Sequence, residues 1–475
     1  LTYFIEADSI GLFRKGIVVS RFQLETELAR DLGLVAATTI IVGGIIGSGI
    51  FGAPAGIAAV LGSPELFLLV WVIGGLLCFS GALCFAELGA MMPRTGGIIV
   101  YLRESYPPHV SFLYGWTETA VICPGALAAV AMICTSYLGY FVPEISLEHV
   151  LLQAGPVMVS TQHLAIFAVL ALLGAVNYAG VRFGGIISNV STFAKVAALL
   201  GLVFLALIVG GSAEHFSTPS ATDREMSLFG ALGTAMVGIL FSYNGWYNTN
   251  NVAGEVKDPR RVLPLAIIIG LSLCMLVYLA VNWAYLYVMS IDEIAGSNQI
   301  AAEVAERLIG PVGGSLTSLA VIVATFGTLN ANIMYMPRIA YGMARERLFF
   351  NWFTRVHPRF RTPSRTITTL TILGMAWSLV GNFMEIVLAV MYVLFVFYVL
   401  TVIAVFILRR KYPDEPRPFK VWGYPVTPLF FIVVSLGYIV STVVFSFGDA
   451  LPGIIVLLLG VPVYLLWFRR QAASA

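Results

Sequence analysis

The most constraining feature of this sequence is a series of long apolar runs joined by short polar segments. A helix needs about 20 apolar residues to cross a bilayer, and its backbone satisfies its own hydrogen bonds there. Runs of this kind are centred near residues 48, 77, 127, 171, 198, 241, 276, 326, 373, 396, 435 and 459. Only 11% of the residues are charged, against about 25% in soluble proteins. The sequence predicts an all-α polytopic membrane protein with twelve transmembrane helices.

The positions of the basic residues predict the orientation of these helices. Lysine and arginine concentrate in cytoplasmic segments. If both termini are cytoplasmic, all of the 27 basic residues fall on the inner side except Lys195, Arg224 and Arg307. We expect a cytoplasmic segment over residues 1–30 and one transmembrane domain over residues 31–470, in the plasma membrane. The expected surroundings are the lipid bilayer. No nucleic acid partner is expected, because no segment is basic enough to bind one.

The first apolar run is interrupted at mid-membrane depth by Gly47-Ser48-Gly49. Glycine inside a helix costs about 1 kcal/mol relative to alanine. A helix break would free amide donors, which attract an anion, and carbonyl oxygens, which attract a cation. An α-amino acid carries both charged groups on one carbon. Small residues also allow close helix packing, so this stretch alone leaves binding and packing open.

A second interruption, Phe241-Ser242-Tyr243-Asn244-Gly245-Trp246, lies in the sixth run. Breaks five spans apart indicate an inverted repeat, with the substrate between the two broken helices. The expected repeats cover residues 31–210 and 228–410, and residues 424–470 form two additional helices. The alternative is that Ser242 and Asn244 only bond neighbouring helices.

Lys195 lies within the fifth run, where a charge costs about 2.5–3.5 kcal/mol. We expect it to face carbonyls released at the first break and the hydroxyl of Thr328. Its ammonium would then hold two helices together as a bound sodium ion does, or bind and release a proton. The alternative is that Lys195 lies near a span end and reaches the membrane surface.

Four glutamates fall in or beside apolar runs. We expect Glu118 and Glu385 to lie near membrane surfaces. Glu87 and Glu255 lie at the expected cytoplasmic ends of spans. Basic residues are close to both in the sequence and could form salt bridges at an inner gate, Arg94 with Glu87, and Lys257, Arg260 or Arg261 with Glu255.

Several blocks together resemble the amino acid–polyamine–organocation superfamily, and within it the L-type amino acid transporters and their bacterial relatives. The blocks are Ile45 to Phe51; Gly81 to Gly89 with Pro93, Gly96 and Gly97; Phe193 to Lys195; Phe241 to Trp246 with Glu255 and Pro259; Asn282 to Tyr285; and Phe326 to Asn330 with Arg338.

The resemblance implies a LeuT-type 5+5 inverted repeat with broken first and sixth helices. It places the substrate carboxylate on amides near Ser48, Gly49 and Ile50, beside Gly47. It places the ammonium on carbonyls of Ile45, Phe241, Ser242 and Asn244. Phe241 resembles the aromatic gate of the family, and Tyr285 resembles a tyrosine that helps close the site. Lys195 with Thr328 resembles the pair that takes the place of a sodium site.

The sequence departs from the family at three places. The segment Pro143 to Gln162 has no cysteine, so no disulfide-linked heavy chain is expected. Cys123 precedes Pro124 where relatives commonly have arginine, and Tyr247 stands where L-type members often have a small polar residue. The last two departures bear on the substrate range.

The resulting expectation is sodium-independent transport of neutral L-amino acids by alternating access, as exchange or facilitated transport. An alternative is proton-coupled symport using Lys195. A remote one is a membrane sensor or enzyme, but none of the five histidines lies at a span centre, and no catalytic set is visible. No metal or cofactor is expected.

Overall fold

A computed structural model describes residues 30–474, apart from residues 95, 156, 181–183, 221–226 and 346–347. The expected N-terminal segment, except Arg30, lies outside the described residues, as do Arg182 and Arg224.

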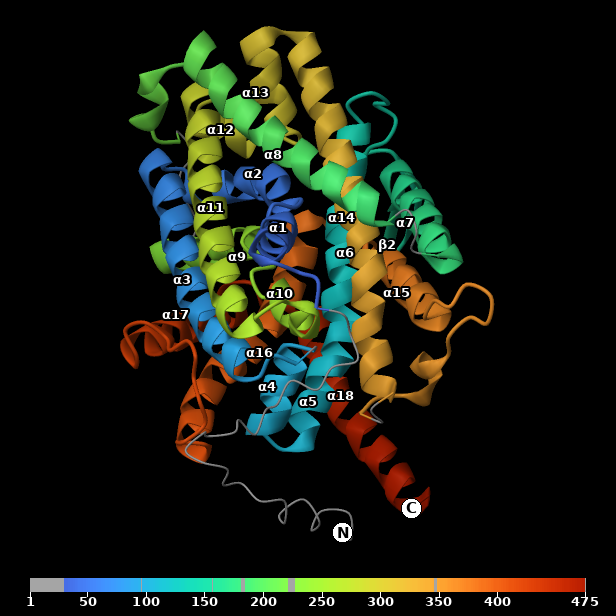
Figure 1. Cartoon of the computed structure of the whole chain (residues 1–475). Coiled ribbons are helices and arrows are strands. Elements are labelled where there is room, and N and C mark those ends of the chain that lie inside the picture. Colours follow the sequence, from blue (N-terminus) through green and yellow to red (C-terminus); the bar gives the residue numbers. More distant parts are fainter. Residues whose placement is uncertain are drawn as a thin grey trace.

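The described chain is built almost entirely from helices (Figure 1). The first half contains α1 (Leu34–Ile45), α2 (Gly49–Leu61), α3 (Pro64–Met91), α4 (Ile98–Ser105), α5 (Pro108–Thr117), η1 (Glu118–Ile122), α6 (Cys123–Leu138), α7 (Thr161–Ala179), α8 (Gly184–Val209) and η2 (Ala213–Phe216). The second half contains α9 (Leu228–Ser242), α10 (Asn248–Asn251), η3 (Ala253–Glu255), α11 (Pro259–Val288), α12 (Ile291–Ala295), α13 (Ile300–Ile309), α14 (Pro311–Arg345), η4 (Asn351–Thr354), α15 (Ser364–Trp377), α16 (Phe383–Lys411), α17 (Val426–Phe445) and α18 (Phe447–Ser474).

One small sheet departs from the all-α expectation. Strands β1 (Val150–Ala154) and β2 (Val157–Ser160) pair antiparallel in the connection between α6 and α7, with Val150 opposite Ser160. The sheet lies in a loop and leaves the helical architecture unchanged.

The polytopic helical architecture is confirmed. Within the described residues, eight helices are long and apolar enough to cross a membrane, and α1 with α2 forms a ninth span bent by 41°. The predicted span centres all fall in helices, except residue 48, which lies between α1 and α2. Because α8, α9 and α15 contain shorter apolar stretches, the count of twelve stays a prediction.

The two broken helices occupy the middle of the bundle (Figure 1). The helix α11 packs on α1 and α3, α2 packs on α9, and α14 packs on α6 and α8. The short helices α12 and α13 lie at one end of the molecule, and α4 and α5 at the other (Figure 1). On the flank, α17 and α18 expose apolar side chains such as Val433, Val444 and Leu458, as expected for contact with lipid.

Glu87 ties α3 to the end of α16 and to the loop that follows. Its carboxylate accepts two hydrogen bonds from Arg409, at 2.8 and 2.5 Å, and one from the Val421 amide at 2.7 Å. Arg417 lies 3.7 Å away. The expected pairing of Glu87 with Arg94 is wrong. Arg409, Arg417 and Val421, which are distant from Glu87 in the sequence, satisfy the buried carboxylate instead.

Candidate functional site

The predicted break in the first span is present, and it frees a carbonyl group. The Gly47 amide donates to the Ile45 carbonyl at 2.7 Å instead of reaching back four residues to Gly43, as a continuing helix requires. The ammonium of Lys195 donates to the Gly43 carbonyl at 2.6 Å. Lys195 is only 2% exposed, so it lies inside the protein rather than at a surface.

The start of α2 presents unsatisfied hydrogen-bond donors. The first amides of a helix have no partner within that helix, and Ser48, the N-cap of α2, makes no side-chain cap bond. The Ser48 hydroxyl oxygen is itself buried without a hydrogen-bond partner. A helix start of this kind carries partial positive charge and suits a carboxylate.

The second break faces the first at close range. The helix α9 ends at Ser242, α10 begins at Asn248, and Gly245 between them has φ +119°. A Cβ atom on Gly245 would lie 2.8 Å from the Gly44 carbonyl carbon, and one on Gly49 would lie 2.5 Å from Ser242 Cα. Glycine is required at both places because backbone meets backbone there.

Tyr278 of α11 links the two breaks. Its hydroxyl lies 2.8 Å from the Ile45 carbonyl and 3.0 Å from the Ser242 carbonyl. The sequence reasoning selected Tyr285 from this helix and missed Tyr278. The seven-residue spacing of the two tyrosines puts both on one helix face, and this could have identified Tyr278 as a second candidate.

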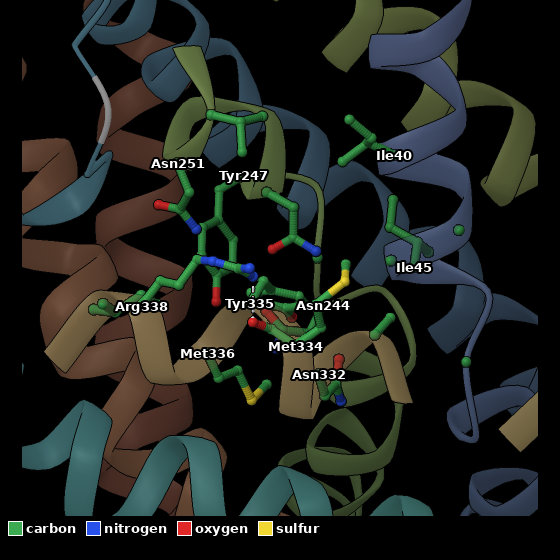
Figure 2. Close-up of a pocket in the computed structure, with 18 of the residues that line it drawn as sticks. Ile40, Ile45, Asn244, Tyr247, Asn251, Asn332, Met334, Tyr335, Met336 and Arg338 are labelled. Atoms are coloured by element: carbon green, nitrogen blue, oxygen red, sulfur yellow. Dashed lines mark hydrogen bonds between the residues drawn. The ribbon is translucent and has the colours of Figure 1, made fainter. Parts of the chain in front are cut away.

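A cavity of about 1970 Å³ extends from the breaks to one end of the bundle. We call that end the charged mouth, defined by Arg94, Arg103, Glu104, Glu255 and Arg338. Figure 2 shows Asn244, Tyr247 and Asn251 facing the cavity opposite residues of α14 that include Tyr335 and Arg338. The breaks are therefore reachable from the charged mouth.

The other side of the breaks is packed shut. The Phe241 and Phe383 rings pack edge-on with their centroids 5.7 Å apart, and the centroids of the Phe51 and Tyr137 rings are 6.3 Å apart. The Tyr137 hydroxyl accepts from the Ala301 amide of α13. Both α12 and α13 pack on α2, so a ligand at the breaks is separated from this end.

The cavity brings together most of the predicted site residues. Ile45, Gly47, Ser48, Gly49, Phe241, Asn244, Lys195 and Thr328 all line it. Ile50, Ser242 and Tyr285 are buried behind the lining. The Tyr285 hydroxyl is 3.5 Å from the Ile50 carbonyl. The Thr328 hydroxyl donates to the Ala324 carbonyl of its own helix. A Cβ on Gly47 would lie 4.0 Å from the Thr328 methyl group.

Glu118 is the acidic residue that the sequence reasoning misplaced. It begins the π-helical turn η1 between α5 and α6, lines the cavity and is 3% exposed. The expectation that it lies near a membrane surface is wrong. A single π turn shifts the helix register, which periodicity read from a sequence does not detect. The two departures from the family pattern, Cys123 and Tyr247, both interact with this carboxyl group.

The comparisons with known proteins agree with this geometry. A family model described as amino acid permease matches residues 32–463. The chain belongs to the amino acid permease family. It is 32% identical over 453 residues to the serine/threonine exchanger SteT of Bacillus subtilis, covering 94% of this chain and 99% of that protein. It is 31% identical to the human large neutral amino acids transporter small subunit 2, covering 92% of this chain and 80% of that protein.

A third relative is the Asc-type amino acid transporter 1 of Mus musculus, with 32% identity over 92% of the permease and 81% of the relative. The family and these relatives are transporters, so the permease is a transporter and not an enzyme. It belongs to the amino acid–polyamine–organocation superfamily and is close to the L-type transporters.

Proposed function

We propose that the permease carries neutral L-amino acids across the plasma membrane by sodium-independent alternating access, as an exchanger or a facilitator. The observation that carries the proposal is the pair of facing helix breaks, one presenting amides and the other carbonyls, at the closed end of a large cavity. Relatives that are named as an exchanger and as neutral amino acid transporters support the substrate class.

In this proposal the backbone recognises the groups that all α-amino acids share. The carboxylate binds the amides of Ser48, Gly49 and Ile50, beside the unpartnered Ser48 hydroxyl. The ammonium binds carbonyls of Ile45, Phe241, Ser242 and Asn244. Each carbonyl has two lone pairs, so the Ser242 carbonyl keeps Tyr278 while accepting the substrate. The Ile45 carbonyl already accepts from the Gly47 amide and from Tyr278, so it must release one of them to accept the ammonium.

The roles of the surrounding residues follow from their positions. Lys195 supplies the positive charge of a sodium ion at the Gly43 carbonyl, next to Thr328. Phe241 is the gate between the substrate and Phe383, and Tyr285 supports α2 when the site closes.

The architecture in this proposal is twelve spans with a LeuT-type inverted repeat. The series α1–α2, α3, α5–α6, α7 and α8 corresponds to α9–α10, α11, α14, α15 and α16, and α17 and α18 follow as additional helices. Both termini are cytoplasmic. The charged mouth then faces the cytoplasm, and the structure is the inward-open state.

The permease works without a disulfide-linked heavy chain in this proposal. All five cysteines are buried, so none is accessible to a partner chain.

Transport into proteoliposomes tests the proposal. Purified permease is supplied with a panel of labelled amino acids, with and without sodium, and with and without unlabelled amino acid inside. We expect uptake of small and medium neutral amino acids, unchanged when sodium is replaced and increased by internal amino acid. No uptake or exchange of any amino acid would overturn the proposal. Accumulation that follows a pH gradient and is lost in Lys195→Ala would favour the alternative, proton symport through Lys195, which is a buried ammonium on the cavity wall.

A further inference from the structure

Glu118 is a buried carboxyl group with no charge partner among the residues that the structure describes. Its polar neighbours are the Tyr114 hydroxyl and the Cys123 thiol, which donates to Oε1 at 3.4 Å, while Oε2 has no hydrogen-bond partner. Tyr247, Tyr335 and Tyr398 also interact with it electrostatically. Glu118 forms no ion pair with any described residue.

These surroundings favour the neutral form of the group. An ionised carboxylate inside a bundle is costly unless a cation or several donors compensate it, and otherwise the group binds a proton. A protonated carboxyl keeps one donor and its acceptor oxygens, which suits a shell of hydroxyl groups that donate and accept. Within membranes, unpaired acidic side chains that face a cavity commonly belong to ion or proton pathways.

Glu118 lies on the way between the breaks and the charged mouth. Glu118, Ile122, Ala126 and Val130 all line the cavity, so its wall follows η1 and α6 from Glu118 to Val130. Twelve residues at 1.5 Å each put Glu118 about 18 Å along the helix from Val130. The Glu118 side chain therefore borders the open cavity at a distance from the substrate site, although little of it is exposed.

From this arrangement we propose that Glu118 is a proton-binding site, loaded and unloaded once in each transport cycle. The proposal rests on the transport function above. It requires net transport rather than exchange, and it makes that transport proton-coupled through span three. Water on the outer side supplies the proton in the outward-open state, and water in the cavity takes it when the carboxyl group ionises in the inward-open state. No other bond forms or breaks.

A chain of side chains connects this site to the second break. Tyr247 interacts with Glu118 and with Tyr398, and the two tyrosine rings lie 5.5 Å apart. The Tyr398 hydroxyl donates to the Asn244 side-chain oxygen at 2.7 Å, and Asn244 lines the cavity at the break. Ionisation turns Glu118 into an acceptor only, so the Tyr114 hydroxyl and the Cys123 thiol must both donate to it, and its negative charge attracts the hydroxyl protons of Tyr247 and Tyr398. This changes what Asn244 presents to the substrate.

Infrared spectroscopy of the purified permease in nanodiscs tests the proton site without requiring transport. We expect a protonated-carboxyl C=O band that titrates with pH and disappears in Glu118→Gln. Cys123→Arg should also remove it, because a guanidinium next to the carboxylate keeps it ionised, whereas Cys123→Ser should retain it. Glu385→Gln is the control, since Glu385 accepts from the Asn382 amide at the start of α16. A titrating band that survives in Glu118→Gln would overturn the proposal.

Uptake driven by a pH gradient tests the coupling. One proton per cycle and a gradient of about one pH unit allow about tenfold accumulation. We expect this ratio of uptake with and without the gradient to fall to one in Glu118→Gln. In the wild type the infrared band should also change when substrate is added. Tyr398→Phe should keep the band but lose this change. A ratio unaltered in Glu118→Gln would contradict the coupling. So would a Glu118→Gln variant that loses only the uptake of cationic amino acids, because the carboxylate would then bind the charge of the substrate rather than a proton. If no amino acid moves in the wild type, the proposed function fails, and the infrared result still reports on the proton site.

Discussion

At the scale of single residues, the Lys195–Gly43 hydrogen bond is the contact that depends most directly on the helix break. Hydrogen bonds to charged groups contribute about 1.5–3 kcal/mol, which corresponds to a change of tenfold or more in a state population. We predict that Lys195→Met, which keeps most of the side-chain volume, lowers the initial rate of uptake at least about tenfold.

Lys257→Met is the matched control for this prediction. It removes one positive charge from an exposed position whose backbone amide, not its side chain, bonds to the Leu32 carbonyl. Uptake should stay near the wild-type rate. Wild-type uptake by Lys195→Met, with the protein folded and inserted, would show that the ammonium is not needed at the break.

Lys195 and Glu118 show what the sequence reveals about buried charges. Lys195 lies far from the ends of its run, and the glycine pattern of the first break identified the carbonyls that it could meet. Glu118 follows Trp116 near the start of its run, which is typical of a residue at a membrane surface. Its burial depends on α14, α16 and the segment after α9, and these contacts form only in the folded bundle.

At the scale of elements, α12 and α13 cover the closed end and carry a pH-dependent contact. Arg307 of α13 donates to Glu293 of α12 at 2.8 Å and lowers the pKa of that carboxyl from its ordinary 4.5 to about 2. A lowered pKa stabilises the folded state above the ordinary value, and this contribution disappears as the pH falls from about 4.5 to about 2. Both side chains are exposed, so the effect is small, about 0.2–1 kcal/mol.

Hydrogen exchange of the α12 and α13 amides checks this prediction. Protection should decrease as the pH falls through this window, after correction for the intrinsic exchange rate. In Glu293→Gln the decrease should be absent. An equal decrease in the variant would assign the pH dependence to other groups.

The elements also differ in how far the sequence predicts them. The long apolar helices and both breaks follow from hydropathy and glycine placement, which are local properties. The periodicity of Ile294, Ile300, Val304 and Leu308 predicts one helix over Ile291–Gly310. In the structure, Gly296 and the residues after it divide this segment into α12 and α13. The sheet of β1 and β2 and the π turn η1 depend on packing against neighbouring segments, so no local pattern indicates them.

At the scale of the whole molecule, the described residues leave the cavity open at the charged mouth and closed beyond the breaks, and this is the geometry that alternating access requires. Facing glycines hold the two breaks together at Gly49 and Gly245, so the broken helices move together rather than separately. The Leu32 amide and carbonyl also bond to the backbone of Glu255 and Lys257. This joins the chain before α1 to the chain before α11, and a rocking motion would carry both.

The last prediction concerns which side of the membrane the open end faces. Because all five native cysteines are buried, single added cysteines can be labelled over a low background. Gly342 lines the cavity with no atom within 4 Å of an added Cβ, so Gly342→Cys should react with an impermeant maleimide in inside-out vesicles. Asn298→Cys, at the exposed turn between α12 and α13, should react in right-side-out vesicles. The reverse pattern would refute the predicted orientation.

Reaction of Ala331→Cys, deeper in the cavity, should slow when saturating substrate holds the closed state, because the breaks and α14 then exclude the reagent together.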